Sequence, residues 1–170
     1  MGLIAYASWC IPCALSCSNV ASGDSDGGVT WAKPQLHVFN RTDPVTNRTS
    51  SANNIVLEES GNSVFIDANP AAPASQRWKM TCSDAAYASP DGLRWSRMGK
   101  NGTKPTQQAD DTKPTGNWDP RLEKYVVFVR RDGGGRHIGR CVTSDFANWE
   151  AEAPAGCPVV FSADSQAFLT

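Results

Sequence analysis

No charge of either sign predominates in this sequence, because 16 Lys and Arg face 17 Asp and Glu, which gives a formal net charge of −1. The chain has no basic stripe, so we expect no nucleic-acid partner. It also has no polybasic segment of the kind that binds a membrane surface. Only two histidines occur, His37 and His137, and neither has an acidic or nucleophilic neighbour in a familiar arrangement. There is no metal-binding cluster, Gly-rich phosphate loop or nucleophile elbow, so we expect no metal and no cofactor.

Long apolar runs are also absent. The most apolar stretch is the N-terminal "MGLIAYASWCIPCALSC", which is too short and too polar for a transmembrane helix. It has the length of a secretory leader, with small residues after it, but it lacks a positive n-region and contains a proline. Two interpretations of residues 1–22 stay open: a cleaved signal peptide, or a strand of an incomplete first repeat.

The six cysteines form no recognisable redox or zinc motif. Cys10, Cys13 and Cys17 make a C-x2-C-x3-C pattern without the βαβ context of a thioredoxin site or the second ligand pair of a zinc site. We interpret them as small residues of a leader or as ordinary buried thiols. Cys141 and Cys157 are spaced so that a disulfide could bridge a hairpin, but sequence alone does not establish it.

Three Asn-x-Thr triplets lie in polar, turn-rich stretches, at Asn40, Asn47 and Asn101. Such stretches are where glycan acceptors occur in secreted proteins. The triplets therefore favour an extracellular or secretory location.

What the chain does have is turn residues between short apolar runs, including 14 Gly and 11 Pro, which is typical of an all-β protein. Residues 61–95 and 116–149 repeat one pattern. Each begins with a run ending in Asp, at Asp67 and Asp119, and continues through a Pro-containing turn and an apolar strand. Each ends in a Ser/Thr-x-Asp turn that leads to a tryptophan. We expect these Asp and Trp residues to hold turns and to pack between repeats, not to catalyse.

Each copy predicts a four-stranded antiparallel unit. We expect strands at residues 77–82 and 124–129, the second covered on both faces because it is almost continuously apolar. Residues 136–143 alternate as a strand near a wet face does, and residues 158–164 supply a fourth strand. Residues 132–136 read as a hairpin tip. Four-stranded units that recur at roughly fifty residues are the signature of propeller blades.

The predicted fold is thus all-β, with β-propeller-type repeats: about two full blades, residues 58–110 and 111–165, plus part of a third. One domain spans residues 23–170. Closed propellers take at least about four blades, so we expect a partial propeller, either a fragment or a protomer that closes by association. Open blade edges would expose apolar faces and allow self-association.

Several segments, taken in order, resemble a known family: "GVTWAKPQL", "SVFIDANPAAPASQRWKM", "AYASPDGLRWS", "DPRLEKYVVFVRRD" and "IGRCVTSDFANW". Together they look like the five-bladed β-propeller glycosidase superfamily, and most of all like the family 32/43-like glycosyl hydrolases. The likeness runs over residues 28–164. It implies a central funnel, lined by the innermost strand of each blade, in which carbohydrate binds.

The resemblance also implies acidic residues at the entrance of the innermost strands, because glycosidic cleavage needs paired carboxylates. "DTKPTGNWD" matches the family's Asp-Thr-x-Asn opening at Asp111, although Lys-Pro-Thr-Gly replaces its apolar middle and its Asn is lost. In the earlier copy, "EESGNSVFID" places Glu58, Glu59 and Asn62 at the corresponding entrance.

We therefore expect Asp111 and Glu59 to be catalytic, and Asn62, Trp118 and Arg130 to bind substrate. Each has a structural alternative. The acids could be solvated loop or turn residues, and Asn62 could bond the backbone at a strand start. Trp118 could serve ordinary packing, and Arg130 could be a charge that snorkels at a strand end.

The function predicted from these residues is that of a glycoside hydrolase-like protein, which hydrolyses or binds glycans through a propeller funnel. The alternative is a non-catalytic carbohydrate-binding or truncated propeller fragment. A sialidase-like Asp-box propeller is less favoured, because it needs an arginine triad. Arg130, Arg136 and Arg140 are too close in sequence to come from three blades.

Overall fold

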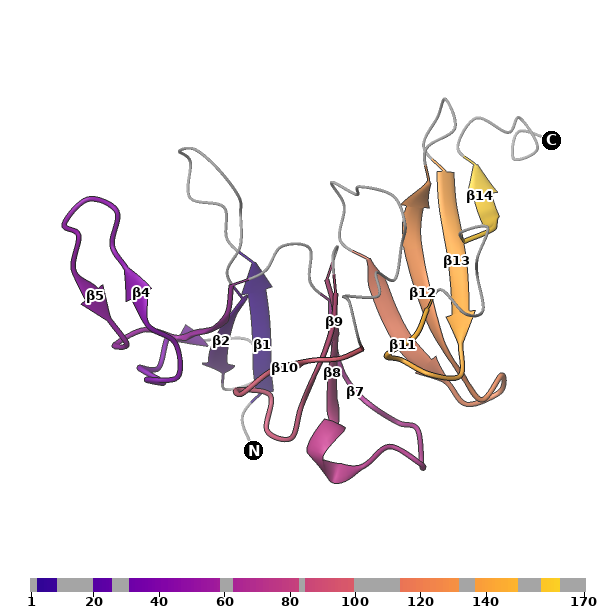
Figure 1. Cartoon of the computed structure of the whole chain (residues 1–170), viewed down its shortest axis with the longest axis horizontal. Helices are drawn as coiled ribbons and strands as arrows, with labels where there is room; N and C mark the ends of the chain where they lie inside the picture. The colour runs from indigo at the N-terminus through magenta and orange to yellow at the C-terminus, as the bar shows by residue number, and fades with distance from the viewer. Residues whose placement is uncertain are drawn as a thin grey trace. The chain divides into compact units, whose positions relative to one another are not determined.

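The computed structural model describes residues 3–8, 20–25, 31–58, 63–82, 85–99, 114–131, 137–149 and 157–162. The described chain is all-β, with one short 3-10 helix, and its sheets are antiparallel (Figure 1). None of its helices combines the length and the apolar character that crossing a membrane requires. The chain divides into two compact units, Met1–Ser60 with Asp91–Trp95, and Gly61–Pro90 with Ser96–Thr170.

The first unit contains a four-stranded sheet centred on β2 (Val20–Ser25). Strand β1 (Leu3–Ser8) pairs with β2 along its whole length, and β3 (Trp31–Ala32) and β6 (Ile55–Leu57) pair with opposite ends of β2. Residues 3–8, which belong to the apolar N-terminal run, are therefore a strand of this sheet.

A separate hairpin of β4 (Arg41–Thr42) and β5 (Thr49–Ser50) also belongs to the first unit. The Asp43 carboxylate closes its turn by accepting hydrogen bonds from the backbone N–H groups of Val45 and Thr46, at 2.8 and 2.9 Å. These two bonds lower the pKa of Asp43, the bond from Thr46 having the larger effect.

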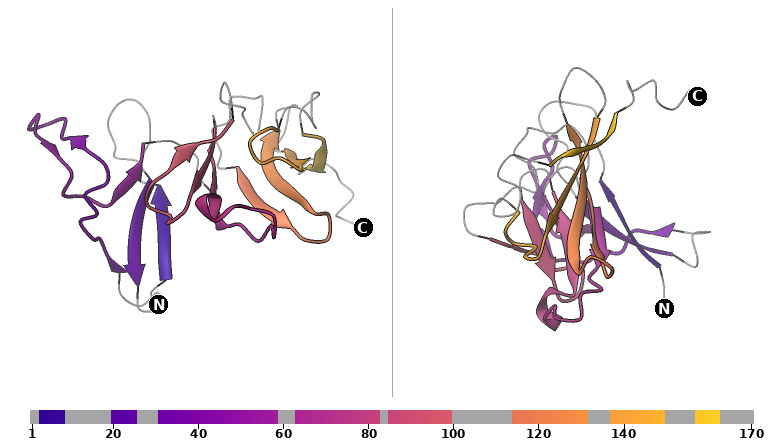
Figure 2. Two further views of the ribbon diagram at one scale, coloured as in Figure 1. Left: turned by 60° about the horizontal axis from the view of Figure 1, so that its bottom comes forward. Right: turned by 90° about the vertical axis from the view of Figure 1, so that its right-hand side faces the viewer.

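The second unit contains two four-stranded sheets in which the strand order follows the chain order. The strands of the first sheet are β7 (Ser63–Ile66), β8 (Trp78–Thr81), β9 (Ala86–Ser89) and β10 (Ser96–Arg97). Those of the second are β11 (Thr115–Asp119), β12 (Lys124–Arg131), β13 (His137–Thr143) and β14 (Val159–Ser162). Both meanders can be followed from two further directions in Figure 2. The predicted all-β fold with four-stranded antiparallel sheets is confirmed, and the sheets fall within residues 58–110 and 111–165.

Aspartate turns connect the strands, as the sequence predicts. In each of four turns, an aspartate Oδ1 accepts a hydrogen bond from the N–H group two residues later. The pairs are Asp67 with Asn69, Asp91 with Leu93, Asp119 with Arg121 and Asp145 with Ala147, at 2.8–2.9 Å. This local bond is the turn that Asp side chains favour, so the turn role of these residues is confirmed.

An aromatic cluster joins the two sheets of the second unit. The Phe146 ring packs edge-on against Phe65 of β7, Tyr125 of β12 and Trp149, with ring centroids 5.1–5.7 Å apart. Edge-to-face contacts of this kind stabilise beyond the area they bury. Trp149 is only 1% exposed, so it packs in the core, and its predicted packing between repeats stays a prediction.

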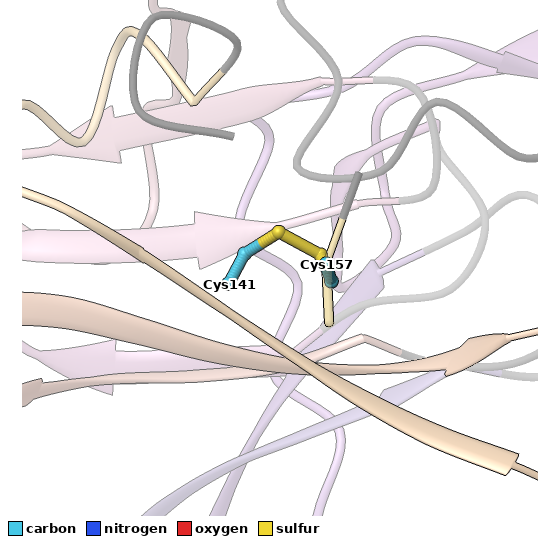
Figure 3. Close-up of a disulfide and its surroundings, with 2 residues drawn as sticks. All are labelled: Cys141 and Cys157. Carbon is cyan, nitrogen blue, oxygen red and sulfur yellow. A yellow bond between two sulfur atoms is a disulfide. The ribbon is translucent and has the colours of Figure 1, made fainter. Parts of the chain in front are cut away.

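The described part of the chain contains the disulfide that the spacing allowed, between Cys141 and Cys157 (Figure 3). Their Cα atoms are 4.6 Å apart, and both residues are buried. The bridge ties β13 to the segment that enters β14. By restricting the unfolded chain, a loop of this size contributes about 3 kcal/mol.

Strand β12 departs from the sequence prediction at one position. Its run was expected to be covered on both faces, but Phe128 is 45% exposed. Tyr125, Val127 and Val129 point into the core, whereas Phe128 belongs to the opposite face, which we call the outer face of the β11–β14 sheet. Val126 lies on the same face and is buried, so among the apolar residues of the run the prediction was wrong for Phe128.

The two sheets lie close together at Gly116 of β11. A Cβ atom added there would lie 2.9 Å from Thr81 Cγ2 and 3.6 Å from the Phe65 ring. Thr81 is fully buried and has a short side chain, so it cannot move away. This position therefore requires glycine, because any other residue would place a Cβ atom too close to Thr81.

We expect Gly116→Ala to lower the free energy of unfolding by about 1–3 kcal/mol, because it overpacks this contact. Urea denaturation of the full chain measures the change. Thr81→Ser removes Cγ2 but keeps the hydroxyl, so Gly116→Ala should cost less in that background. An alanine variant as stable as the wild type would contradict the close approach.

Candidate functional site

Three of the residues predicted to form the site, Asp111, Glu59 and Asn62, lie outside the described residues. Their roles stay predictions. Glu58, the alternative acid beside Glu59, directly follows β6, and its side chain is exposed.

The two other predicted site residues are described. Trp118 is 8% exposed and belongs to the core cluster, where its ring packs edge-on against Tyr125 at 4.8 Å. Trp118 therefore has the ordinary packing role that was the alternative to substrate binding. Stacking of a sugar on Trp118 stays a prediction. Arg130 is half-buried near the end of β12, opposite Ile138 of β13. The structure does not bring Trp118 and Arg130 together, because β12 pairs Tyr125 with Trp118, five residues before Arg130.

Strands β7 and β11, the first strands of the two sheets, begin side by side. Ser63 opens β7 and is the register partner of Thr81. The Thr81 hydroxyl donates a 3.0 Å hydrogen bond to the carbonyl of Pro114, which directly precedes β11. The start of β7 and the start of β11 therefore lie at one end of the two sheets.

The same strands also end side by side. Asp67 directly follows β7, and its Oδ2 accepts a 2.7 Å hydrogen bond from the Tyr125 hydroxyl. Tyr125 is the register partner of Trp118, near the end of β11. The two first strands thus run in the same direction. In sequence, Glu59 and Asn62 come just before β7, and Asp111 comes just before β11.

At the opposite end, the two sheets share a buried polar network that the sequence did not predict. The Lys79 and Asp67 side chains are 2% and 0% exposed, and Lys79 Nζ lies 3.5 Å from Asp67 Oδ2. The Tyr125 hydroxyl donates to the same carboxylate oxygen and accepts a 3.0 Å bond from the Asn69 amide. Lys79 also donates to Gln76 Oε1 at 2.9 Å, and its ammonium lies 5.5 Å from the centre of the Phe146 ring.

The burial of this network changes its titration. Loss of water contact lowers the pKa of Lys79, and the nearby carboxylates of Asp67 and Asp145 oppose that change. Burial raises the pKa of Tyr125 far above 10.0; the Asn69 amide opposes the rise, and the bond to Asp67 adds to it. The phenol therefore stays protonated and keeps donating to Asp67.

This network holds the two sheets together and is closed to substrate. Its signal in the sequence was a lysine within the apolar run "RWKMTC", because a buried lysine normally requires a partner. The partner, Asp67, had been assigned only to its turn. Its Oδ1 makes that turn while its Oδ2 serves the network.

Asp67→Asn should lower the free energy of unfolding by about 3–5 kcal/mol, because it leaves the buried Lys79 ammonium without a counter-charge. The asparagine can still accept the turn bond from Asn69. Thermal and urea unfolding measure the loss.

Asp119→Asn is the matched control. Asp119 makes the same type of turn, but its ion pair with Arg121, at 3.7 Å, is exposed to solvent. Exposed pairs contribute little, so only a small loss is expected. Asp67→Asn with Lys79→Met should recover part of the stability, since it removes both charges. Equal losses at Asp67 and Asp119 would argue against a buried ion pair.

Tyr125→Phe tests the network through pH. Because the pKa of Tyr125 is raised in the folded state, its contribution is complete below the unfolded pKa of about 10 and falls as pH rises above it. The wild type should be more stable than Tyr125→Phe near pH 8, and the gap should shrink toward about pH 11. Lys79 is present in both proteins, so its titration largely cancels. A gap independent of pH would show that the phenol is not held protonated.

The described residues contain no group of three or more His, Cys, Asp or Glu side chains that could hold a metal ion. Comparison of the chain with protein-family models, with curated proteins and with solved structures finds no match in any of the three. A functional assignment therefore depends on the chain's own geometry and chemistry.

Proposed function

We propose that the two sheets of the second unit are neighbouring blades of a partial β-propeller, and that the protein hydrolyses or binds glycans. The observation that carries the proposal is the arrangement of β7 and β11. They are the first strands of successive four-stranded meanders, they lie side by side, and they run in the same direction. Blades around a common axis have their innermost strands in this relation.

The end at which β7 and β11 begin is where the proposed function places the sugar. The segments that carry Glu59 and Asn62, and the segment that carries Asp111, enter these two strands. A pair of carboxylates flanking one glycosidic bond can supply a general acid and a nucleophile or base. Asn62 would bind a sugar hydroxyl and Arg130 would orient a carboxylate. Trp118 lies at the opposite end of β11, so it takes no part in this site.

A secretory location fits this proposal. The Cys141–Cys157 disulfide is of the kind that persists in oxidising compartments. Asn40 and Asn47, two of the three sequon asparagines, are exposed. Both are therefore accessible as glycan acceptors, and the proposed ligands are also extracellular polymers.

Asp111→Asn tests the catalytic part of the proposal. The full chain is assayed against a panel of aryl glycosides, and Asp110→Asn, which alters the neighbouring acid, is the matched control. If Asp111 is a funnel carboxylate, its variant should lose at least about 100-fold in turnover, as general acid–base residues do, while Asp110→Asn keeps its rate. Unchanged turnover in Asp111→Asn removes that residue from the mechanism.

The alternative, a non-catalytic glycan-binding protein, predicts a different outcome. No glycoside would be cleaved, yet glycans would bind to the wild type. The Asp111→Asn variant would fold but would bind them more weakly. Binding to a glycan array, measured alongside hydrolysis, separates the two forms of the proposal.

A further inference from the structure

A pocket of about 610 Å³ lies on the outer face of the β11–β14 sheet. This size falls within the range of about 300–1,000 Å³ that is typical of small-molecule sites. Its chemistry is mixed, with an aromatic ring, two guanidinium groups, an amide, a hydroxyl and a carboxylate. These groups belong to Phe128, Arg140, Arg121, Asn117, Thr115 and Asp119.

Three of these residues form one row across three strands. Thr115 of β11 is the register partner of Phe128 of β12, and Phe128 is the partner of Arg140 of β13. Neighbouring strands are about 4.8 Å apart. The exposed Phe128 ring therefore has a hydroxyl on one side and a guanidinium on the other, each one strand away. Asn117 lies two residues along β11 on the same face.

The polar groups of this row have no competing partner in the described chain. The Arg140 guanidinium makes no hydrogen bond or ion pair with any described residue. The Asn117 Oδ1 accepts the Trp118 N–H at 2.8 Å, which leaves its amide N–H₂ group to donate. Asp119, the carboxylate among the lining residues, interacts with the Arg121 side chain and accepts the hydrogen bond of its own turn. Arg140 is therefore the guanidinium of the pocket that has no acidic partner among the described residues.

We propose that this pocket binds an acidic saccharide through a hexuronate residue. The sugar ring lies on the Phe128 ring, its carboxylate takes the Arg140 guanidinium in a bidentate pair, and its hydroxyls bond Thr115 and Asn117. The pocket explains why a large aromatic side chain stays 45% exposed in the middle of a strand. The choice of a saccharide rests on the proposed function, but the pocket needs none of the carboxylates proposed for hydrolysis.

Calorimetric titration of the full chain with α-1,4-linked trigalacturonate tests the proposal, and the fully methyl-esterified trimer is the matched ligand. We expect the acid form to bind at least about tenfold more tightly than the ester, because the ester cannot form the charge-assisted pair. The affinity for the acid form should fall with added salt. Arg140→Gln should weaken acid binding about tenfold and abolish the preference over the ester. Phe128→Ala should weaken both ligands.

Arg94→Gln is the control variant. Arg94 is exposed and pairs with Asp91 outside the pocket, so its loss should leave binding unchanged. All three altered side chains are exposed, and thermal unfolding checks that the variants fold.

Equal affinity for acid and ester, or unchanged binding by Arg140→Gln, overturns the proposal. So does an oligoglutamate peptide of equal charge that binds as tightly as the trimer, since the site would then recognise acidic chains in general. Sedimentation that shows dimers dissociated by Phe128→Ala, with no saccharide binding, would assign the face to a second copy of the chain. Trigalacturonate binding that survives in Asp111→Asn separates this pocket from the hydrolytic proposal: either one can fail while the other holds.

Discussion

The second unit depends on one buried ion pair. Lys79 comes from the middle of β8 and Asp67 from the turn after β7, and Tyr125 of the other sheet donates to the same carboxylate oxygen. Two charges removed from water stabilise a fold only if their remaining hydrogen-bonding capacity is used. Here the Lys79 ammonium donates to Gln76 and lies over the Phe146 ring, and the Asn69 amide donates to the Tyr125 hydroxyl. The network thereby joins the two sheets by polar contacts, in addition to the aromatic contacts of Phe146 with Phe65 and Tyr125.

The network joins the two sheets of the second unit at one end of their interface. At the other end, Gly116 allows the two sheets to lie close together. The missing side chain lets β11 lie against Thr81, and the Thr81 hydroxyl reaches the Pro114 carbonyl. Together these contacts orient β7 and β11 in parallel, with both starts at one end. The proposed glycan site follows from that orientation, because chain segments entering neighbouring first strands at one end can present side chains to a common ligand.

Local chemistry explains what the sequence could predict. The aspartate turns at Asp91 and Asp119 follow from bonds within two residues, and β13 was evident from its alternation. The role of Lys79 could not be predicted, because its partners are brought close only by folding. The exposure of Phe128 was missed for the opposite reason: an apolar run shows that a strand can be buried, but not that another element covers it. For the candidate site, the sequence supplied Asp111, Glu59 and Asn62 as entrance residues, and the structure supplied the shared direction of the strands they precede.

The Cys141–Cys157 bridge has a consequence for the chain when a protease cuts its backbone. The residues between the two cysteines carry the Asp145 turn, Phe146 and Trp149. A protease that cuts the backbone once within this loop leaves both fragments covalently linked, so β14 stays attached to β13. The last strand of the sheet is therefore retained after a nick that would release it from a chain without the bridge.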